Sequence, residues 1–149
     1  MTPALAETLQ MVAAAAHSAA DPWWIIGSAA VVLHGGVVGR VKDVDLMMSA
    51  RDAEGLLRRA GVEPRRGTGD ERFRRMVFGS WSKPPIPVEA FGGFELCAGG
   101  VWRAVALDTR EAVTVGGAQV FVPSREELVR LLQSFGRAKD LERARLLVK

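Results

Sequence analysis

Two aspartates separated by one residue interrupt an apolar segment, and this pattern constrains the fold more than any other feature. Asp43 and Asp45 flank Val44, and the apolar segment continues to Met48. Because the side chains of a β-strand alternate between its two faces, both carboxylates point to one side and Val44 to the other. Two carboxylates on one face of a buried strand repel each other and are costly to bury unless a cation lies between them. The pattern predicts either a site for a divalent cation that prefers oxygen ligands, or an edge strand with two solvated acids.

Composition places the chain among ordinary globular proteins. Its 149 residues are 48% hydrophobic and 25% charged, which favours one domain over residues 1–149, with helices over 124–148 packed on it. No apolar stretch approaches the ~20 residues that span a bilayer, and residues 1–20 lack the basic start of a secretory signal. We therefore expect a cytoplasmic protein with no membrane partner. The single cysteine, Cys97, cannot form an internal disulfide. The net charge of +3 permits a polyanionic partner such as RNA without requiring one.

Periodicity and turn residues predict an α+β fold, with a strand–helix–strand start, a mostly antiparallel remainder and helices at both ends. We expect helices over 3–19, 28–33, 50–60, 126–134 and 138–148, and strands over 23–26, 41–48, 72–78, 86–91, 102–107, 112–115 and 119–122. The polar, glycine-containing segment 64–70 predicts a mobile loop. Gly116–Gly117 fits a hairpin turn. Ser124 is the expected N-cap of its helix, with Glu127 in the capping-box position.

Two further features bear on chemistry. Gly27 and Ser28 follow a short apolar strand and open a helix, where glycine lets the backbone approach a phosphate and free N–H groups favour negative charge. The same pair also fits an ordinary turn. Glu89 lies in the middle of an apolar strand, which is an unusual place for an acid. Glu89 is either a partner for one of the many arginines or, if its strand adjoins that of Asp43 and Asp45, the third member of a carboxylate cluster.

Such a cluster suits phosphoryl-type transfer. Two carboxylates hold Mg²⁺, which bridges triphosphate oxygens, and a third carboxylate activates the attacking hydroxyl. Arg40, just before the paired acids, either neutralises them without a metal or contacts phosphate. His34 is expected to cap or pack a helix, and Trp23 to anchor the core. The arginines between positions 65 and 75 fit either a solvated face or a grip on RNA or nucleotide phosphate.

Three motifs resemble those of a known superfamily. The Gly-Ser, paired-acid and third-acid motifs of the DNA polymerase β-like nucleotidyltransferases are matched by Gly27-Ser28, Asp43-Val44-Asp45 and Val88-Glu89-Ala90. More narrowly, residues 33–45 and 136–141 are similar to segments of small bacterial nucleotidyltransferases of the AbiEii toxin type. The resemblance covers the chain from about Trp23 to Leu147. It departs from the common pattern at Glu89, where many members have Asp, and at Arg143, near a place where relatives often carry an acid.

The resemblance implies a mixed, mostly antiparallel sheet flanked by helices. It also implies transfer of a nucleoside monophosphate from a nucleoside triphosphate to a hydroxyl, with Mg²⁺ or Mn²⁺ as cofactor. By matching position, the metal ligands and catalytic residues are Asp43, Asp45 and Glu89, and the nucleotide-binding residues are Gly27, Ser28, Arg40, Lys139 and Asp140. The implied acceptors are an RNA such as tRNA, a protein or a small molecule. A toxin–antitoxin system is one setting that fits the resemblance. Separately, a domain this small can complete its site with a second copy, as a homodimer, or with a cognate partner protein. The alternative is a degenerate module of the same fold that binds nucleotide, RNA or a protein partner.

Overall fold

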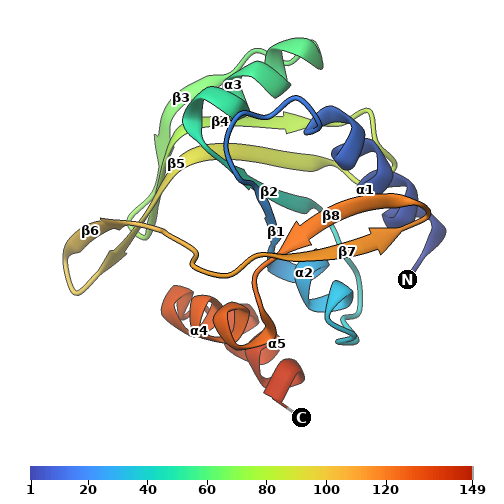
Figure 1. The fold of residues 1–149 in the computed structure, drawn as a ribbon. Helices are drawn as coiled ribbons and strands as arrows, with labels where there is room; N and C mark the ends of the chain where they lie inside the picture. Colours follow the sequence, from blue (N-terminus) through green and yellow to red (C-terminus); the bar gives the residue numbers. More distant parts are fainter. Residues whose placement is uncertain (149) are drawn as a thin grey trace.

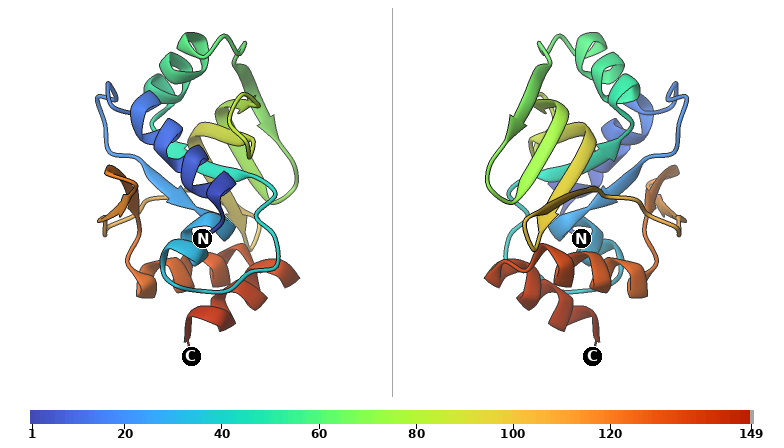
Figure 2. Two further views of the ribbon diagram at one scale, coloured as in Figure 1. Left: turned by 90° about the vertical axis from the view of Figure 1, so that its right-hand side faces the viewer. Right: turned by 90° about the vertical axis from the view of Figure 1, so that its left-hand side faces the viewer.

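The computed structural model describes residues 1–148 and contains a curved six-stranded sheet with helices against both of its sides (Figures 1 and 2). The strand order is β1-β2-β5-β4-β3, and β6 pairs with the second half of β5. The strands of this sheet are β1 (Trp24–Ile26), β2 (Val44–Met48), β3 (Arg65–Gly69), β4 (Phe73–Trp81), β5 (Val88–Ala98) and β6 (Val101–Ala104). The hairpin of β7 (Glu111–Val115) and β8 (Ala118–Val122) forms a second sheet. The pair β2–β5 is parallel, and the other strand pairs are antiparallel.

Helices lie on both sides of the sheet. They are α1 (Pro3–Ala15), α2 (Gly27–Leu33), α3 (Ala50–Arg59), α4 (Arg125–Phe135) and α5 (Ala138–Val148). Helix α3 packs on β4 and β5, whereas α4 and α5 lie side by side below the opposite face of the sheet (Figures 1 and 2). Helix α4 meets the sheet through Phe135, whose ring lies 5.1 Å from that of Phe73 and 5.9 Å from that of Phe94, measured between centroids. Within residues 1–148, no helix combines the length and apolarity needed to cross a bilayer.

The α+β class and the mostly antiparallel sheet are confirmed, and so is the hairpin at Gly116–Gly117. The prediction for residues 64–70 was wrong. Residues 64–70 are not a loop, because most of them form β3, which pairs with β4 at the edge of the sheet. An edge strand has one free side and tolerates polar side chains. The two glycines of β3, at positions 67 and 69, obscured its strand character in the sequence.

Strand β5 is also longer than the predicted segment 86–91, since it continues through Gly92 and Gly93 to Ala98. Glycine at position 92 signals close packing rather than a strand end. A Cβ there would lie 2.6 Å from backbone atoms of Ser49 and Ala50, at the start of α3. The missing side chain therefore lets helix α3 rest directly on the sheet.

The predicted capping box of α4 forms only in part. Ser124 Oγ accepts the hydrogen bond of the Glu127 backbone N–H at 3.1 Å, as expected. The carboxylate of Glu127, however, accepts hydrogen bonds from the backbone N–H groups of Asp108 and Thr109, at 2.7 and 2.8 Å, and from the Thr109 hydroxyl. Glu127 is 7% exposed, so it joins α4 to the segment between β6 and β7 from inside the protein. His34, at the end of α2, contacts the Pro123 carbonyl oxygen through Nε2 at 2.7 Å.

Glu127 is the side chain whose loss should destabilise this junction most. Glu127→Ala leaves the N–H groups of Asp108 and Thr109 without their acceptor, so we expect the free energy of unfolding to fall by about 2–3 kcal/mol. The neighbouring Glu126 is exposed, and Glu126→Ala should change stability by less than about 0.5 kcal/mol. Urea denaturation of both variants measures the difference. Equal losses would show that the hydrogen bonds to Glu127 do not stabilise the junction.

Candidate active site

The site begins where β1 passes directly into α2. Ile26, the last residue of β1, pairs with Asp45 of the antiparallel strand β2. The next residue, Gly27, has a φ of 70°, in the left-handed region that favours glycine. A Cβ at Gly27 would lie 2.5 Å from Oδ2 of Asp45. Glycine is therefore required here both by the backbone turn and by the carboxylate beside it.

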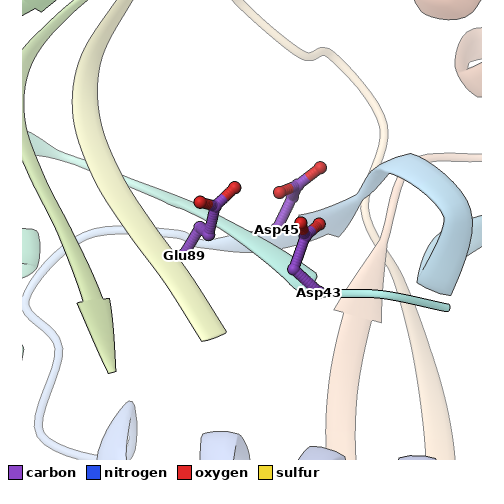
Figure 3. Close-up of side chains that lie close together, drawn as sticks. All are labelled: Asp43, Asp45 and Glu89. Atoms are coloured by element: carbon purple, nitrogen blue, oxygen red, sulfur yellow. The ribbon is translucent and has the colours of Figure 1, made fainter. Parts of the chain in front are cut away.

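The parallel pairing of β2 with β5 brings the third acid into place. Asp45 stands directly opposite Glu89 in the register of these two strands. Asp43 lies just before β2, and carboxylate oxygens of the three acids lie within 4.8 Å of one another. Figure 3 shows the three side chains on the same side of the two strands, with their carboxylates converging. The structure thus joins the three acids that the sequence pattern singled out.

The surroundings of these carboxylates leave their negative charge largely uncompensated. In the part of the chain that the structure describes, none of the three acids forms a salt bridge, although all three are partly buried. Burial, together with the charges of Asp43 and Glu89, raises the pKa of Asp45 to about 7, and the charges of Arg75 and Arg143 oppose this. Burial and the charge of Asp43 also raise the pKa of Glu89, opposed by Arg75 and Lys139. The cluster is therefore a region of unbalanced negative charge.

A divalent cation fits this donor set. Mg²⁺ and Mn²⁺ prefer oxygen ligands, and three converging carboxylate oxygens supply them without histidine or cysteine. A bound cation would also remove the repulsion that raises the pKa of Asp45. The residues present thus match the group expected from the sequence. Their roles as ligands and catalytic residues stay predictions.

The residues expected to bind the nucleotide lie on three different segments and differ in exposure. Gly27 and Ser28 lie in the first turn of α2, and Ser28 is 6% exposed. Lys139, in the first turn of α5, is exposed, and its positive charge lowers the pKa of Glu89, so its ammonium group acts on the cluster. Arg40 is exposed on the segment that leads to β2, and it forms no salt bridge with Asp43 or Asp45 among the described residues.

Asp140 differs from the others because its carboxylate already has a partner. It is 1% exposed and accepts hydrogen bonds from Nε and Nη2 of Arg137 at 2.6 and 3.1 Å. This pair ties the first turn of α5 to the residue before it. The structure therefore gives Asp140 a positioning partner, and its contact with a nucleotide stays a prediction.

Two arginines act on the cluster, and the sequence singled out neither of them. Arg143 was noted only as a departure from the family pattern, and Arg75 only as one of several arginines that fit a solvated face or a grip on phosphate. Arg143 lies one helical turn after Lys139 on α5, so both side chains share a face of that helix. Arg75 lies on β4, and its charge acts on both Asp45 and Glu89. The spacing of four residues between Lys139 and Arg143 could have indicated that Arg143 also faces the site. Nothing in the sequence separated Arg75 from the other arginines of its strand.

Comparison with solved structures places this geometry in a known fold. No family model matches the sequence, and no curated protein matches it. The crystal structure of TM1012 from Thermotoga maritima, a candidate nucleotidyltransferase, superposes with a TM-score of 0.78 over 97% of this chain and 92% of that chain, at 22% identity. The chain has a nucleotidyltransferase fold.

A second protein with this fold is the antibiotic-resistance factor ANT(2″)-Ia. Its solution structure superposes with a TM-score of 0.63 at 15% identity, over 99% of this chain and 84% of that chain. Its crystal structure in complex with adenylyl-2″-tobramycin gives a TM-score of 0.59 at 15% identity, covering 98% and 88%. Identities this low support the shared fold and leave the activity of this chain to be argued from its own residues.

The unbalanced charge of Asp45 predicts a pH-dependent stability in metal-free protein. The folded pKa of about 7 exceeds the ordinary value of 3.8, so folding retains a proton that the unfolded chain releases between these pH values. Stability therefore falls as pH rises through this window and stays lowered above it. Asp45→Asn removes the charge, so we expect it to stabilise the protein at pH 8 by about 2–4 kcal/mol and to have little effect near pH 4.

Chemical denaturation in EDTA at pH 4, 6 and 8 measures this trend. The control is Glu71→Gln, at an exposed acid away from the cluster, which should change stability equally little at each pH. If the stabilisation by Asp45→Asn does not grow with pH, the raised pKa of Asp45 is contradicted.

A comparison of alanine variants at Gly27 and Gly35 separates the cost of backbone strain from the effect of contact with the Asp45 carboxylate. Gly27 and Gly35 both have positive φ, 70° and 89°, so alanine at either should cost about 1–2 kcal/mol of stability. A Cβ at Gly35 meets nothing within 4 Å, whereas a Cβ at Gly27 displaces the carboxylate of Asp45. We therefore expect Gly27→Ala, and not Gly35→Ala, to weaken Mn²⁺ binding by roughly tenfold or more. Titration calorimetry with Mn²⁺ tests this. Equal affinities in the two variants would argue against Asp45 as a ligand.

Proposed function

We propose that the protein is a metal-dependent nucleotidyltransferase, which moves a nucleoside monophosphate from a nucleoside triphosphate to an acceptor hydroxyl. One observation carries the proposal. Three carboxylates that have no ion-pair partner among residues 1–148 converge within 4.8 Å, beside the glycine that opens α2, on a nucleotidyltransferase fold. Such a cluster is costly to retain unless it binds a cation.

Each residue of the cluster has a proposed role. Asp43, Asp45 and Glu89 hold the divalent ion, Mg²⁺ or Mn²⁺, which when bound stabilises negative charge on the triphosphate and on the departing diphosphate. Glu89 serves as a ligand or accepts the proton of the acceptor hydroxyl. Its raised pKa suits the second role, because a more basic carboxylate is a better proton acceptor near neutral pH.

The groups around the cluster hold the nucleotide. Backbone N–H groups at Gly27 and Ser28 point from the start of α2 and bind phosphate oxygens. Lys139 and Arg143 project from one face of α5 and supply positive charge on the cluster side. Arg40 contacts phosphate from the segment before β2. With the ion bound, these cations would face a triphosphate rather than bare carboxylates.

The acceptor is the open part of the proposal. The name of ANT(2″)-Ia and its complex with adenylyl-2″-tobramycin favour a small-molecule hydroxyl as one acceptor. An RNA such as tRNA and a protein hydroxyl are the other two classes. Membership of the AbiEii-like branch and a toxin–antitoxin setting, with a homodimer or a cognate partner protein, stay predictions.

A second candidate function is a non-catalytic module that binds nucleotide, RNA or a protein partner. One observation favours it. Arg143 stands near a position where relatives often carry an acid, and it acts on Asp45 together with Arg75. These two arginines oppose part of the negative charge without a metal.

Thermal denaturation distinguishes the two candidates. We expect Mg²⁺ and ATP together to raise the melting temperature of the wild type by several degrees, because binding to the folded state stabilises it by mass action. The double variant Asp43→Asn/Asp45→Asn should lose this shift. The control Glu71→Gln lies outside the cluster and should retain it.

Incubation of each variant with α-³²P-labelled triphosphates and separate acceptors (total tRNA, cellular protein or aminoglycosides) then tests transfer. Label that appears on one acceptor class with the wild type, and not with the double variant, supports the enzyme. ATP binding that is independent of the two aspartates, without transfer, supports the module.

A further inference from the structure

A cavity of about 730 Å³ lies beside one edge of β5, between the end of β2, where Met48 pairs with Gly92, and the end of β6, where Ala104 pairs with Glu95. Its wall includes Met47, Thr68, Arg75, Phe94 and Val105, so residues of β2, β3, β4, β5 and the segment after β6 line it. The volume falls within the range of small-molecule sites, which are mostly apolar with a few placed polar groups. The cavity does not include the three acids.

Two polar atoms in the wall are buried without a hydrogen-bond partner. They are Oγ1 of Thr68 and Nε of Arg75. Within residues 1–148, only one other side-chain atom, Nε1 of Trp81, is in that state. Thr68 and Arg75 are directly paired between β3 and β4, so their side chains share a face of the sheet. Since buried polar groups are nearly always bonded, a hydroxyl and an N–H side by side indicate a ligand oxygen between them.

The guanidinium of Arg75 lies among aromatic rings and forms no salt bridge within residues 1–148. Its guanidinium carbon lies 5.3 Å from the ring centroid of Phe78, 5.4 Å from that of Phe91 and 5.6 Å from that of Phe94. Contacts of this kind fix the side chain, while its Nε–H has no hydrogen-bond partner among the described residues. The planar guanidinium favours a carboxylate partner. The apolar walls at Met47 and Val105 would contact an apolar body.

The cavity adjoins the acid cluster. Met47 lies two residues after Asp45, on the same face of β2, which separates the two Cα atoms by about 7 Å. Arg75 belongs to the cavity wall, and its charge reaches both Asp45 and Glu89. A molecule seated in the cavity and extending past Met47 would therefore approach the cluster.

We infer that this cavity is the acceptor site, and that the acceptor is a compact molecule with an apolar body, a carboxylate bound by Arg75 and Thr68, and a hydroxyl presented to the acid cluster. The inference rests on the proposed function. The hydroxyl oxygen forms a bond to the α-phosphorus, the bond from that phosphorus to the diphosphate breaks, and the hydroxyl proton passes to Glu89. The volume of the cavity matches a small molecule, which favours this class of acceptor over an RNA.

The test uses 3-(hydroxymethyl)benzoate as a probe, titrated into ¹⁵N-labelled protein and followed by NMR. We expect Thr68→Val, which removes the unpaired hydroxyl, to weaken binding about fivefold, and Arg75→Lys, which keeps the charge and removes Nε–H, to weaken it about tenfold or more. Thr114→Val is the matched control on the exposed face of β7 and should bind the probe as the wild type does. Benzyl alcohol, which lacks the carboxylate, should bind about tenfold more weakly than the probe.

The same samples separate this inference from the proposed function. We expect Thr68→Val to keep the melting-temperature shift with Mg²⁺ and ATP, and the wild type to form probe-linked label from α-³²P ATP. If the shift persists but the probe does not bind, or binds both cavity variants as it binds the wild type, the acceptor site is overturned and the nucleotide site stands. Binding without any transfer in the presence of Mg²⁺ and ATP overturns the acceptor role. Loss of the shift in the wild type itself counts against the proposed function.

Discussion

The parallel pairing of β2 with β5 is the constraint on which the rest of the site depends. It sets Asp45 opposite Glu89 in register, although the two residues are far apart in the sequence. The antiparallel neighbour β1 then ends beside Asp45, so that the turn into α2 at Gly27 touches the same carboxylate. A shift of β2 by one residue would turn its acids to the other face. The apolar residues of β2 thereby fix the position of the charged ones.

The cost of this arrangement is electrostatic. Three carboxylates converge without an ion pair among the described residues, and burial together with mutual repulsion raises the pKa values of Asp45 and Glu89. Arg75, Lys139 and Arg143 moderate the repulsion from a distance. Because they do not contact the acids as ion-pair partners, they leave the carboxylate oxygens available. This is the charge distribution expected of a site that exchanges a cation and a polyanionic nucleotide.

The sequence predicted the features that follow from local pattern and missed those that follow from packing. Alternation placed Asp43 and Asp45 on one face, and the mid-strand position marked Glu89, so the convergence of the cluster was foreseeable. Strand β3 was not foreseeable, because its glycines and arginines give no apolar alternation, and its existence depends on pairing with β4. The side chain of Glu127 likewise turned from its helix to Asp108 and Thr109, a long-range contact that no local motif encodes. The same limit kept Arg75 from being distinguished from the other arginines of its strand, because its surroundings come from the rings of four separate phenylalanines.

The glycines of β5 connect these packing effects to the proposed chemistry. Gly92 lets α3 press on one face of the strand, while Gly93, with a φ of 62°, departs from extended geometry in mid-strand. A Cβ at Gly93 would lie 2.5 Å from the Cβ of Met76 on β4, so both strands approach closely at this point. Strand β2 ends opposite Gly92, and β6 begins to pair only from Glu95 onward. The cavity beside the acid cluster occupies this gap. Glycine, which lowers strand propensity, therefore breaks the regular sheet at the place where an acceptor would need room.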